Sequence, residues 1–236
     1  MQAGPKDKSL AYWKEELSEL PDLEMVLDKE RAPVLTNSRS SLNFTISSET
    51  VAKLRDICIA NGCSLRTGMI AAFASCMCRH TTQTDICVGH KIPTRNNDTN
   101  YEVAILLEYN GNANSFLDYL KAVENKVTKA YAHGNVTFQD LVHTLKLQPN
   151  SRRNLIFQTM FNYYESPLTI PEPATINNIC EIVVEMQDSA DGGMTGQLHF
   201  LIDLYELPTM QRFAGHFSVL LHEIAHQPSV LLDSVP

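Results

Sequence analysis

Residues 41–96 carry the clearest structural signal in this chain and read SLNFTISSETVAKLRDICIANGCSLRTGMIAAFASCMCRHTTQTDICVGHKIPTRN. At the start of this segment, apolar Leu42, Phe44 and Ile46 alternate with polar residues. Alternation with a period of two is typical of a strand that buries one face and exposes the other. We therefore expect a half-buried strand at the beginning of the segment.

Two helices are expected after this strand. Ser48 can cap the first helix, and Asn61–Gly62 is a typical helix end. Ser64 can cap the second helix, whose apolar residues cover most of its surface. A helix this apolar is expected to lie against a sheet, and residues 85–93 provide a second strand rich in β-forming residues.

The rest of the chain extends this pattern in both directions. Further helices are expected at residues 10–20, from Asn114 or Ser115, at 138–146 and from Pro208, and further strands at 101–110, 154–164, 179–187 and 196–205. Helices interleaved with runs of strands favour the α/β class. We predict a layered sandwich in which helices pack on one mixed β-sheet.

The composition indicates a folded chain without an excess of positive charge. Its 236 residues contain 19 Lys and Arg against 27 Asp and Glu, a formal net charge of −8. This field repels phosphate backbones, and no basic run exceeds the Arg152–Arg153 pair, which argues against nucleic-acid binding. No stretch has the roughly 20 apolar residues that cross a bilayer, and no secretory signal is visible. We expect a cytoplasmic protein with no membrane partner, in which residues 1–9 are a disordered start or a cloning remnant and residues 10–236 fold.

The sequence His222-Glu223-Ile224-Ala225-His226 matches the H-E-x-x-H motif of zinc proteases, on an expected helix. Histidines four residues apart share a helix face and could bind zinc while Glu223 acts as a general base. A catalytic zinc also needs a third protein ligand, but only ten residues follow His226. We favour the alternative, the polar face of an amphipathic helix, and assign no metal ligand.

The cysteines do not form a disulfide framework in a chain of this length. They are Cys58, Cys63, Cys76, Cys78, Cys87 and Cys180. The spacing Cys76-x-Cys78-x-His80 suggests a metal site, but residues two apart on a helix point to different faces. Buried cysteines that act as small apolar side chains are the favoured interpretation. A Cys–His nucleophile pair stays open, because its partners would meet only in space.

Several segments together resemble nonribosomal peptide synthetase condensation domains, in the order in which that family carries them. They are YWKEELSELPDLE, residues 41–96, YAHGNVTF, SRRNLIFQTMFNYYE and LPTMQRFAGHFSVLLHEIAHQP. The resemblance runs from Leu10 nearly to Pro236 and covers the C-terminal lobe of such a domain. It implies a chloramphenicol-acetyltransferase-like lobe, since condensation domains are built from two such lobes with a tunnel between them.

The family's active-site signature, His-His followed by three residues and Asp-Gly, lies in the preceding lobe or at its junction. All eight histidines of this sequence are isolated. The histidine that assists amine attack in the family is therefore missing here, and no catalytic residue is assigned. The resemblance implies that this lobe is inactive alone.

Residues that match family motifs are candidates for weak tunnel or structural roles: Arg95, Asn96, His133, Phe138, Arg153, Asn154 and Phe157. The family's Gly-x-Phe-Val-Asn-Thr stretch, which lines the tunnel, is replaced by NDTNYEVAILLEYN, residues 97–110. The residues themselves favour simpler roles. Arg153 is expected in a fold-stabilising ion pair rather than as a substrate clamp. His133 is expected to cap a helix and Asn154 to hold a turn.

The resemblance implies one wall of the tunnel in which a carrier-bound acyl or peptidyl thioester is joined to a carrier-bound amino acid by amide formation. The implied partners are carrier (thiolation) domains, the missing N-terminal lobe and a neighbouring adenylation domain. No cofactor is expected on the chain itself, and phosphopantetheine would be carried by the partner carrier proteins. The alternative is a degenerate, non-catalytic interaction module that docks carrier or tailoring proteins in a peptide or hybrid polyketide–peptide synthetase.

Overall fold

The computed structural model describes residues 4–92, 102–111, 113–148, 150, 152–165 and 180–235. Its elements follow the predicted order. The helices are α1 (Pro5–Glu16), α2 (Ser48–Ala60), α3 (Leu65–Thr81), α4 (Phe116–Ala132), α5 (Phe138–Leu145) and α6 (Leu207–His226), with a final 3₁₀ turn at Leu232–Ser234. The strands are β1 (Arg39–Ile46), β2 (Asp85–Lys91), β3 (Glu102–Glu108), β4 (Thr159–Tyr164), β5 (Ile182–Asp188) and β6 (Met194–Leu201). Arg95, Asn96 and residues 97–101 lie outside the described residues.

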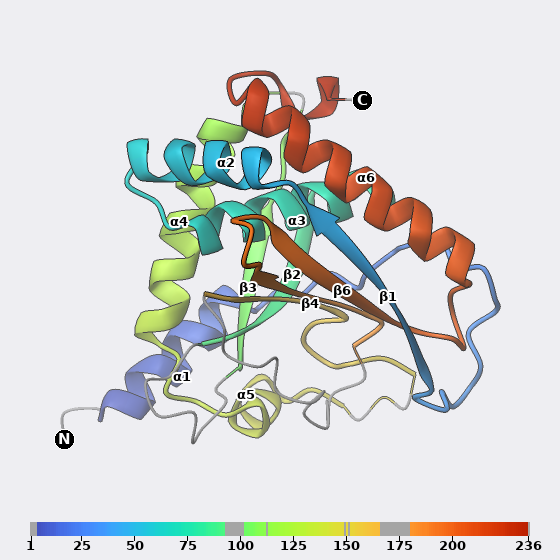
Figure 1. Cartoon of the computed structure of the whole chain (residues 1–236). Coiled ribbons are helices and arrows are strands. Elements are labelled where there is room, and N and C mark those ends of the chain that lie inside the picture. The colour runs from blue at the N-terminus through green and yellow to red at the C-terminus, as the bar shows by residue number, and fades with distance from the viewer. Residues whose placement is uncertain are drawn as a thin grey trace.

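The described strands form one six-stranded mixed sheet in the order β1-β6-β5-β4-β2-β3. Strands β2, β4 and β5 run parallel, and the pairs at both ends of the sheet are antiparallel. Helices α3, α4 and α6 contact the strands from one side, and α2 packs on α3 and α6, as Figure 1 shows. Helices α1 and α5 pack on each other away from this layer. The predicted α/β sandwich with a mixed sheet is confirmed.

Alternation along the strands gives the sheet two different faces. In β6, Leu198 is fully buried, while its neighbours Gln197 and His199 are only partly buried. The face that includes Leu198 lies under the helices and holds the aromatic core. There the ring of Phe161 on β4 lies 5.2 Å from that of Phe73 on α3 and 6.4 Å from that of Phe217 on α6, measured between ring centroids.

Helix α1 begins at Pro5, five residues before the expected start. Proline at the first helical position has the right φ and lacks the N–H that would otherwise go unpaired. The Asp7 carboxylate accepts a hydrogen bond from the Gly4 N–H at 3.0 Å, and Ser9 is buried. Residues 5–9 therefore belong to the fold, which corrects the expectation of a disordered start there.

The residues that cap the helices lie within one residue of their predicted positions. The first helix of the 41–96 segment is capped by Ser47 rather than Ser48, because the Ser47 hydroxyl accepts a hydrogen bond from the Thr50 N–H at 3.2 Å. Ser64 caps α3 as predicted. Thr137 caps α5 and forms the expected capping box with Asp140.

A buried ion pair fixes the connector between α1 and β1 to the sheet. The Arg31 guanidinium lies 2.8 Å from the carboxylate of Glu181, which is fully buried, and the Tyr205 hydroxyl donates to the same carboxylate at 3.1 Å. The connector therefore lies against the start of β5, an interior strand of the sheet.

None of the described helices is both long and apolar enough to cross a membrane by itself. Helices α2 and α3 pass this test of length and composition only as a pair, with a bend of 108° between them.

Candidate functional site

The sheet face turned away from α3 and α6 carries a polar cluster on β4, β5 and β6, formed by Tyr164, Glu185 and His199. The Tyr164 hydroxyl donates a hydrogen bond to Glu185 Oε1 at 3.1 Å. His199 Nε2 lies 3.5 Å from Glu185 Oε2, which is long for a hydrogen bond but close enough for an ion pair. The Glu185 side chain is 6% exposed and that of His199 is 12% exposed. We call these three residues the polar-face cluster.

The electrostatics of this cluster keep Glu185 ionised. Burial by itself would raise the pKa of this carboxyl, but the contact with His199, the charge of Lys91 and the Tyr164 hydroxyl more than offset it and lower the pKa. In turn, burial and the Glu185 charge raise the pKa of Tyr164, so its phenol keeps its proton. The cluster can therefore accept hydrogen bonds or hold a cationic group at neutral pH, but Glu185 is a weak proton acceptor.

Sequence reasoning did not single out the polar-face cluster. A signal for it was present, because Glu185 interrupts the apolar run ICEIVVEMQ and His199 occupies an alternate position of GQLHF. A charged residue inside a strand that is otherwise buried is unusual and needs a partner. The partner could not be assigned, since the pairing register of β5 and β6 was unknown.

Three of the sequence candidates meet just before β4. The Asn154 side chain accepts hydrogen bonds from the N–H groups of Ile156 and Phe157 at 2.9 and 3.1 Å, so it holds a turn. The Phe157 ring contacts the Phe138 ring edge to face at 6.0 Å. The same ring covers Gly89 on β2, where an added Cβ would come within 2.4 Å of it. These contacts close the sheet near α5.

The other two described candidates make contacts within the fold. Arg153 Nη1 lies 2.8 Å from the carboxylate of Asp22. His133 is the C-cap residue of α4, its ring stacks on Tyr12 with 4.2 Å between ring centroids, and its carbonyl accepts a hydrogen bond from the Trp13 indole at 2.8 Å. The structure therefore gives each residue a partner in the connector or in α1. Arg95 and Asn96 lie outside the described residues.

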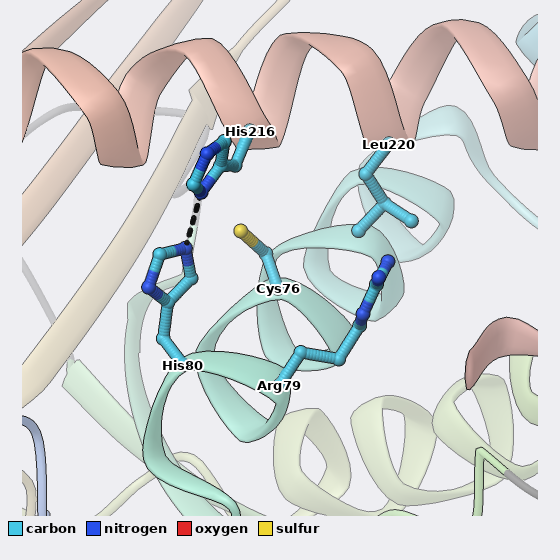
Figure 2. A pocket seen from close by; sticks show the side chains of 5 residues that line it. All are labelled: Cys76, Arg79, His80, His216 and Leu220. Atoms are coloured by element: carbon cyan, nitrogen blue, oxygen red, sulfur yellow. Dashed lines mark hydrogen bonds between the residues drawn. The ribbon is translucent and has the colours of Figure 1, made fainter. Parts of the chain in front are cut away.

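A cavity of about 300 Å³ opens between α3 and α6, lined by Cys76, Arg79, His80, His216 and Leu220 (Figure 2). One ring nitrogen of His216, Nδ1, lies 3.2 Å from Nε2 of His80. The Arg79 guanidinium lies on the Leu220 side in Figure 2 and donates to the Val235 carbonyl at 2.5 Å. Because His80 and His216 are far apart in sequence, their meeting was not foreseen.

The protonation states of Cys76 and His80 decide whether this cavity can activate a nucleophile. Burial raises the pKa of the Cys76 thiol to about 12. Burial, together with the charges of His216 and Arg79, lowers the pKa of His80 to about 4. A base this weak cannot take the proton of so weak an acid. The cavity therefore does not supply an activated Cys–His nucleophile, the possibility that the sequence left open.

The H-E-x-x-H segment forms the end of α6. The His222 and His226 rings lie 4.1 Å apart, and His226 Nε2 lies 2.7 Å from Lys53 Nζ and 3.5 Å from the Glu49 carboxylate. Among the described residues, no group of three or more His, Cys, Asp or Glu side chains is placed to hold a metal ion. Each of the six cysteines is buried and unpaired.

Comparison with known proteins places the chain in a family. The model of the condensation domain family matches residues 2–236. One of the plipastatin synthase subunits of Bacillus subtilis (strain 168) is 29% identical over 246 residues, which cover 95% of this chain and 7% of that protein. Bacitracin synthase 2 of Bacillus licheniformis is 26% identical over 246 residues, which cover 97% of this chain and 9% of that protein. The chain thus spans a small part of these relatives.

Two solved structures share the fold. The four-domain nonribosomal peptide synthetase holo-AB3403, bound to AMP and glycine, has a TM-score of 0.87 at 16% identity over 98% of this chain and 20% of that chain. The X-domain from teicoplanin biosynthesis, in its complex with OxyB, has a TM-score of 0.86 at 19% identity, and the match covers 99% of this chain and 56% of that chain. Because the family model covers nearly the whole sequence, this chain belongs to the condensation domain family of nonribosomal peptide synthetases.

Proposed function

We propose that this chain is the C-terminal lobe of a condensation domain and forms one wall of the tunnel in which amide bonds are made. The observation that carries the proposal is coverage: 99% of the chain matches only 56% of the X-domain chain. A second observation supports it. The sheet has one apolar face under helices and one face with the polar-face cluster, and a wall that contacts polar substrates needs such a face.

The reaction proposed for the complete domain is acyl transfer to nitrogen. The amine of a carrier-bound amino acid attacks the thioester carbon of a carrier-bound acyl or peptidyl group. A C–N bond forms, the C–S bond breaks, the amine proton passes to a base, and the departing thiolate takes up a proton. Two tethered substrates held in one tunnel meet at a high effective concentration, which supplies much of the rate.

We infer that this chain alone does not supply the base that the reaction needs. No His-His pair occurs in the sequence. Glu185 has a lowered pKa and His80 a pKa of about 4, so neither is matched to accepting an amine proton near neutral pH. The base would come from the N-terminal lobe. The other proposed partners are carrier domains, which bring the phosphopantetheine, and a neighbouring adenylation domain, in the cytoplasm.

A carrier-to-carrier transfer assay tests this proposal. The chain is mixed with one carrier protein loaded with an acyl thioester and another loaded with an amino acid, with and without an N-terminal lobe that carries His-His. No amide product is expected from the chain alone, and product is expected once the lobe is added. Turnover by the chain alone would overturn the proposal, and so would a complete pair of lobes that binds both carriers but stays inactive.

A second candidate function is a non-catalytic docking module. The observation in its favour is the X-domain itself, which shares this fold and was solved in complex with OxyB. In this case the chain would bind a carrier or tailoring protein without transferring a group. Titration of the chain with holo and apo carrier proteins distinguishes the two: binding without transfer, even beside an N-terminal lobe, favours the docking module.

A further inference from the structure

We propose that a second cavity, lined by Arg79 and Asp233, binds a small zwitterion of the class of a free α-amino acid. Its volume is about 410 Å³, which is within the range of small-molecule sites, about 300–1,000 Å³. The cavity lies beside the C-terminal end of α3 and includes no residue of the polar-face cluster. This inference therefore does not depend on the tunnel proposed above.

Three segments that are distant in sequence form this cavity. Arg79 belongs to the last turn of α3, Tyr109 follows β3, and Asp233 lies in the 3₁₀ turn. The Asp233 N–H donates a hydrogen bond to the Gly111 carbonyl at 3.1 Å, and the Arg79 guanidinium donates to the Val235 carbonyl. The 3₁₀ turn is therefore attached to both other segments, and these contacts hold the charged residues at one cavity.

Gly111 lets the Asp233 carboxylate lie close to the Tyr109 phenol. A Cβ at position 111 would overlap with Asp233 Oδ1 and with the Tyr109 hydroxyl. Without it, the Tyr109 hydroxyl donates a hydrogen bond to Asp233 Oδ1 at 2.6 Å. Burial and the contact with Asp233 raise the pKa of Tyr109, so the phenol keeps its proton and acts as a donor. The phenol thus orients the carboxylate and leaves its second oxygen for a ligand.

Arg79 and Asp233 carry opposite charges that do not pair. In the described part of the chain, the partner of the Arg79 guanidinium is the neutral Val235 carbonyl, and that of the Asp233 carboxylate is the neutral Tyr109 hydroxyl. Both charges act on the Tyr109 phenol, since Asp233 raises its pKa and Arg79 partly offsets the rise. The two charges are therefore close to the same cavity, but each is available to a ligand.

A free α-amino acid matches this arrangement of charge. Its carboxylate can accept hydrogen bonds from the Arg79 guanidinium, and its ammonium group can donate to the Asp233 carboxylate. Hydrogen bonds between charged groups are roughly twice as strong as those between neutral groups. A simple cation would be repelled by Arg79 and a simple anion by Asp233. The cavity therefore favours a ligand that carries both charges and has no net charge.

The experiment is a titration of the purified chain with L-alanine, followed by ligand-observed NMR. We expect saturable binding of one L-alanine per chain, which high salt weakens because it screens the charges. L-Alanine methyl ester keeps only the ammonium group, and N-acetyl-L-alanine keeps only the carboxylate. Each should bind at least about 10-fold more weakly than L-alanine, because each leaves one charged group of the site without its hydrogen-bond partner.

Four variants test whether the binding occurs at this cavity. Arg79→Met and Asp233→Asn each remove one charge with little change in side-chain size, and each should weaken L-alanine binding by about 10-fold or more. Arg212→Met and Asp56→Asn remove the same kinds of charge at exposed positions of α6 and α2, and they should bind like the unaltered chain.

Circular dichroism checks that each variant is folded. If one variant of the cavity does not fold, the other variant and the two analogues decide. The proposal is overturned if L-alanine shows no saturable binding, or if either analogue binds as tightly as L-alanine. It is also overturned if the variants at exposed positions lose as much affinity as the variants of the cavity.

Discussion

The two faces of the sheet come from the same strands, yet alternate residues make them differ in kind. On the face under the helices, Phe161 is fully buried among aromatic rings from α3 and α6. On the opposite face, Glu185 forms a polar cluster with Tyr164 and His199. The first arrangement is explained completely by packing. The polar cluster places the ionised Glu185 carboxylate where an apolar side chain would cost less free energy to bury. Such a placement is typical of a surface that contacts a substrate or a partner.

The largest expected effect is on the helix-covered face. Phe161→Ala should lower the free energy of unfolding by about 3–5 kcal/mol, because it removes a buried ring and leaves a cavity. Urea denaturation followed by circular dichroism measures this change. Phe44→Ala is the matched control, since Phe44 contacts Phe217 on the same face but is only partly buried on the edge strand β1. Equal losses from the two variants would contradict the view that this face acts through burial.

The helix-covered face was largely predictable, because its signals are local. Alternation at Leu42, Phe44 and Ile46 located β1, and the Ser64 cap located the start of α3. Each signal depends on residues within one turn or a few positions along a strand. The main local error was the start of α1, where Pro5 and Asp7 extend the helix toward the N-terminus.

The candidate sites were not predictable in the same way, because they depend on contacts between distant segments. His80 and His216 belong to helices far apart in sequence, and no spacing rule brings them together. Glu185 meets Tyr164 only through the parallel pairing of β4 and β5, which places Asn162 opposite Glu185. The family resemblance could name motif residues such as Arg153 and His133, but it could not name the partners Asp22 and Tyr12.

On the polar face a smaller effect that depends on pH is expected. Glu185→Gln should lower the free energy of unfolding at pH 7 by about 1–3 kcal/mol, because it leaves the buried polar partners of the carboxylate imperfectly paired. Tyr164→Phe removes only the hydroxyl and serves as the milder partner variant. Chemical denaturation of both variants and of their combination gives the coupling energy between the two residues.

The sign of the pH effect follows from the lowered pKa of Glu185 in the folded chain. A group whose pKa is lower in the folded than in the unfolded chain contributes stability above its unfolded pKa, here the ordinary value of 4.5. That contribution is lost as the pH falls through the folded pKa. The difference in stability between the unaltered chain and Glu185→Gln should therefore shrink below about pH 4.5. A difference that grows on acidification would contradict the assignment of an ionised Glu185.

The smallest effect is expected at Arg153, whose ion pair with Asp22 lies at the surface, with side chains 22% and 69% exposed. Exposed ion pairs contribute about 0–1 kcal/mol, so Arg153→Ala and Asp22→Ala should each change the free energy of unfolding little. The double variant should lose no more stability than the more destabilised single variant. High salt should shrink the effect further, because it screens surface charges. The transfer assay with an added N-terminal lobe separates this role from a tunnel role. If Arg153 only pairs with Asp22, both single variants keep the same transfer rate. If Arg153 contacts substrate, only Arg153→Ala slows transfer, and the polar surface of this chain then extends from β5 and β6 to the segment before β4.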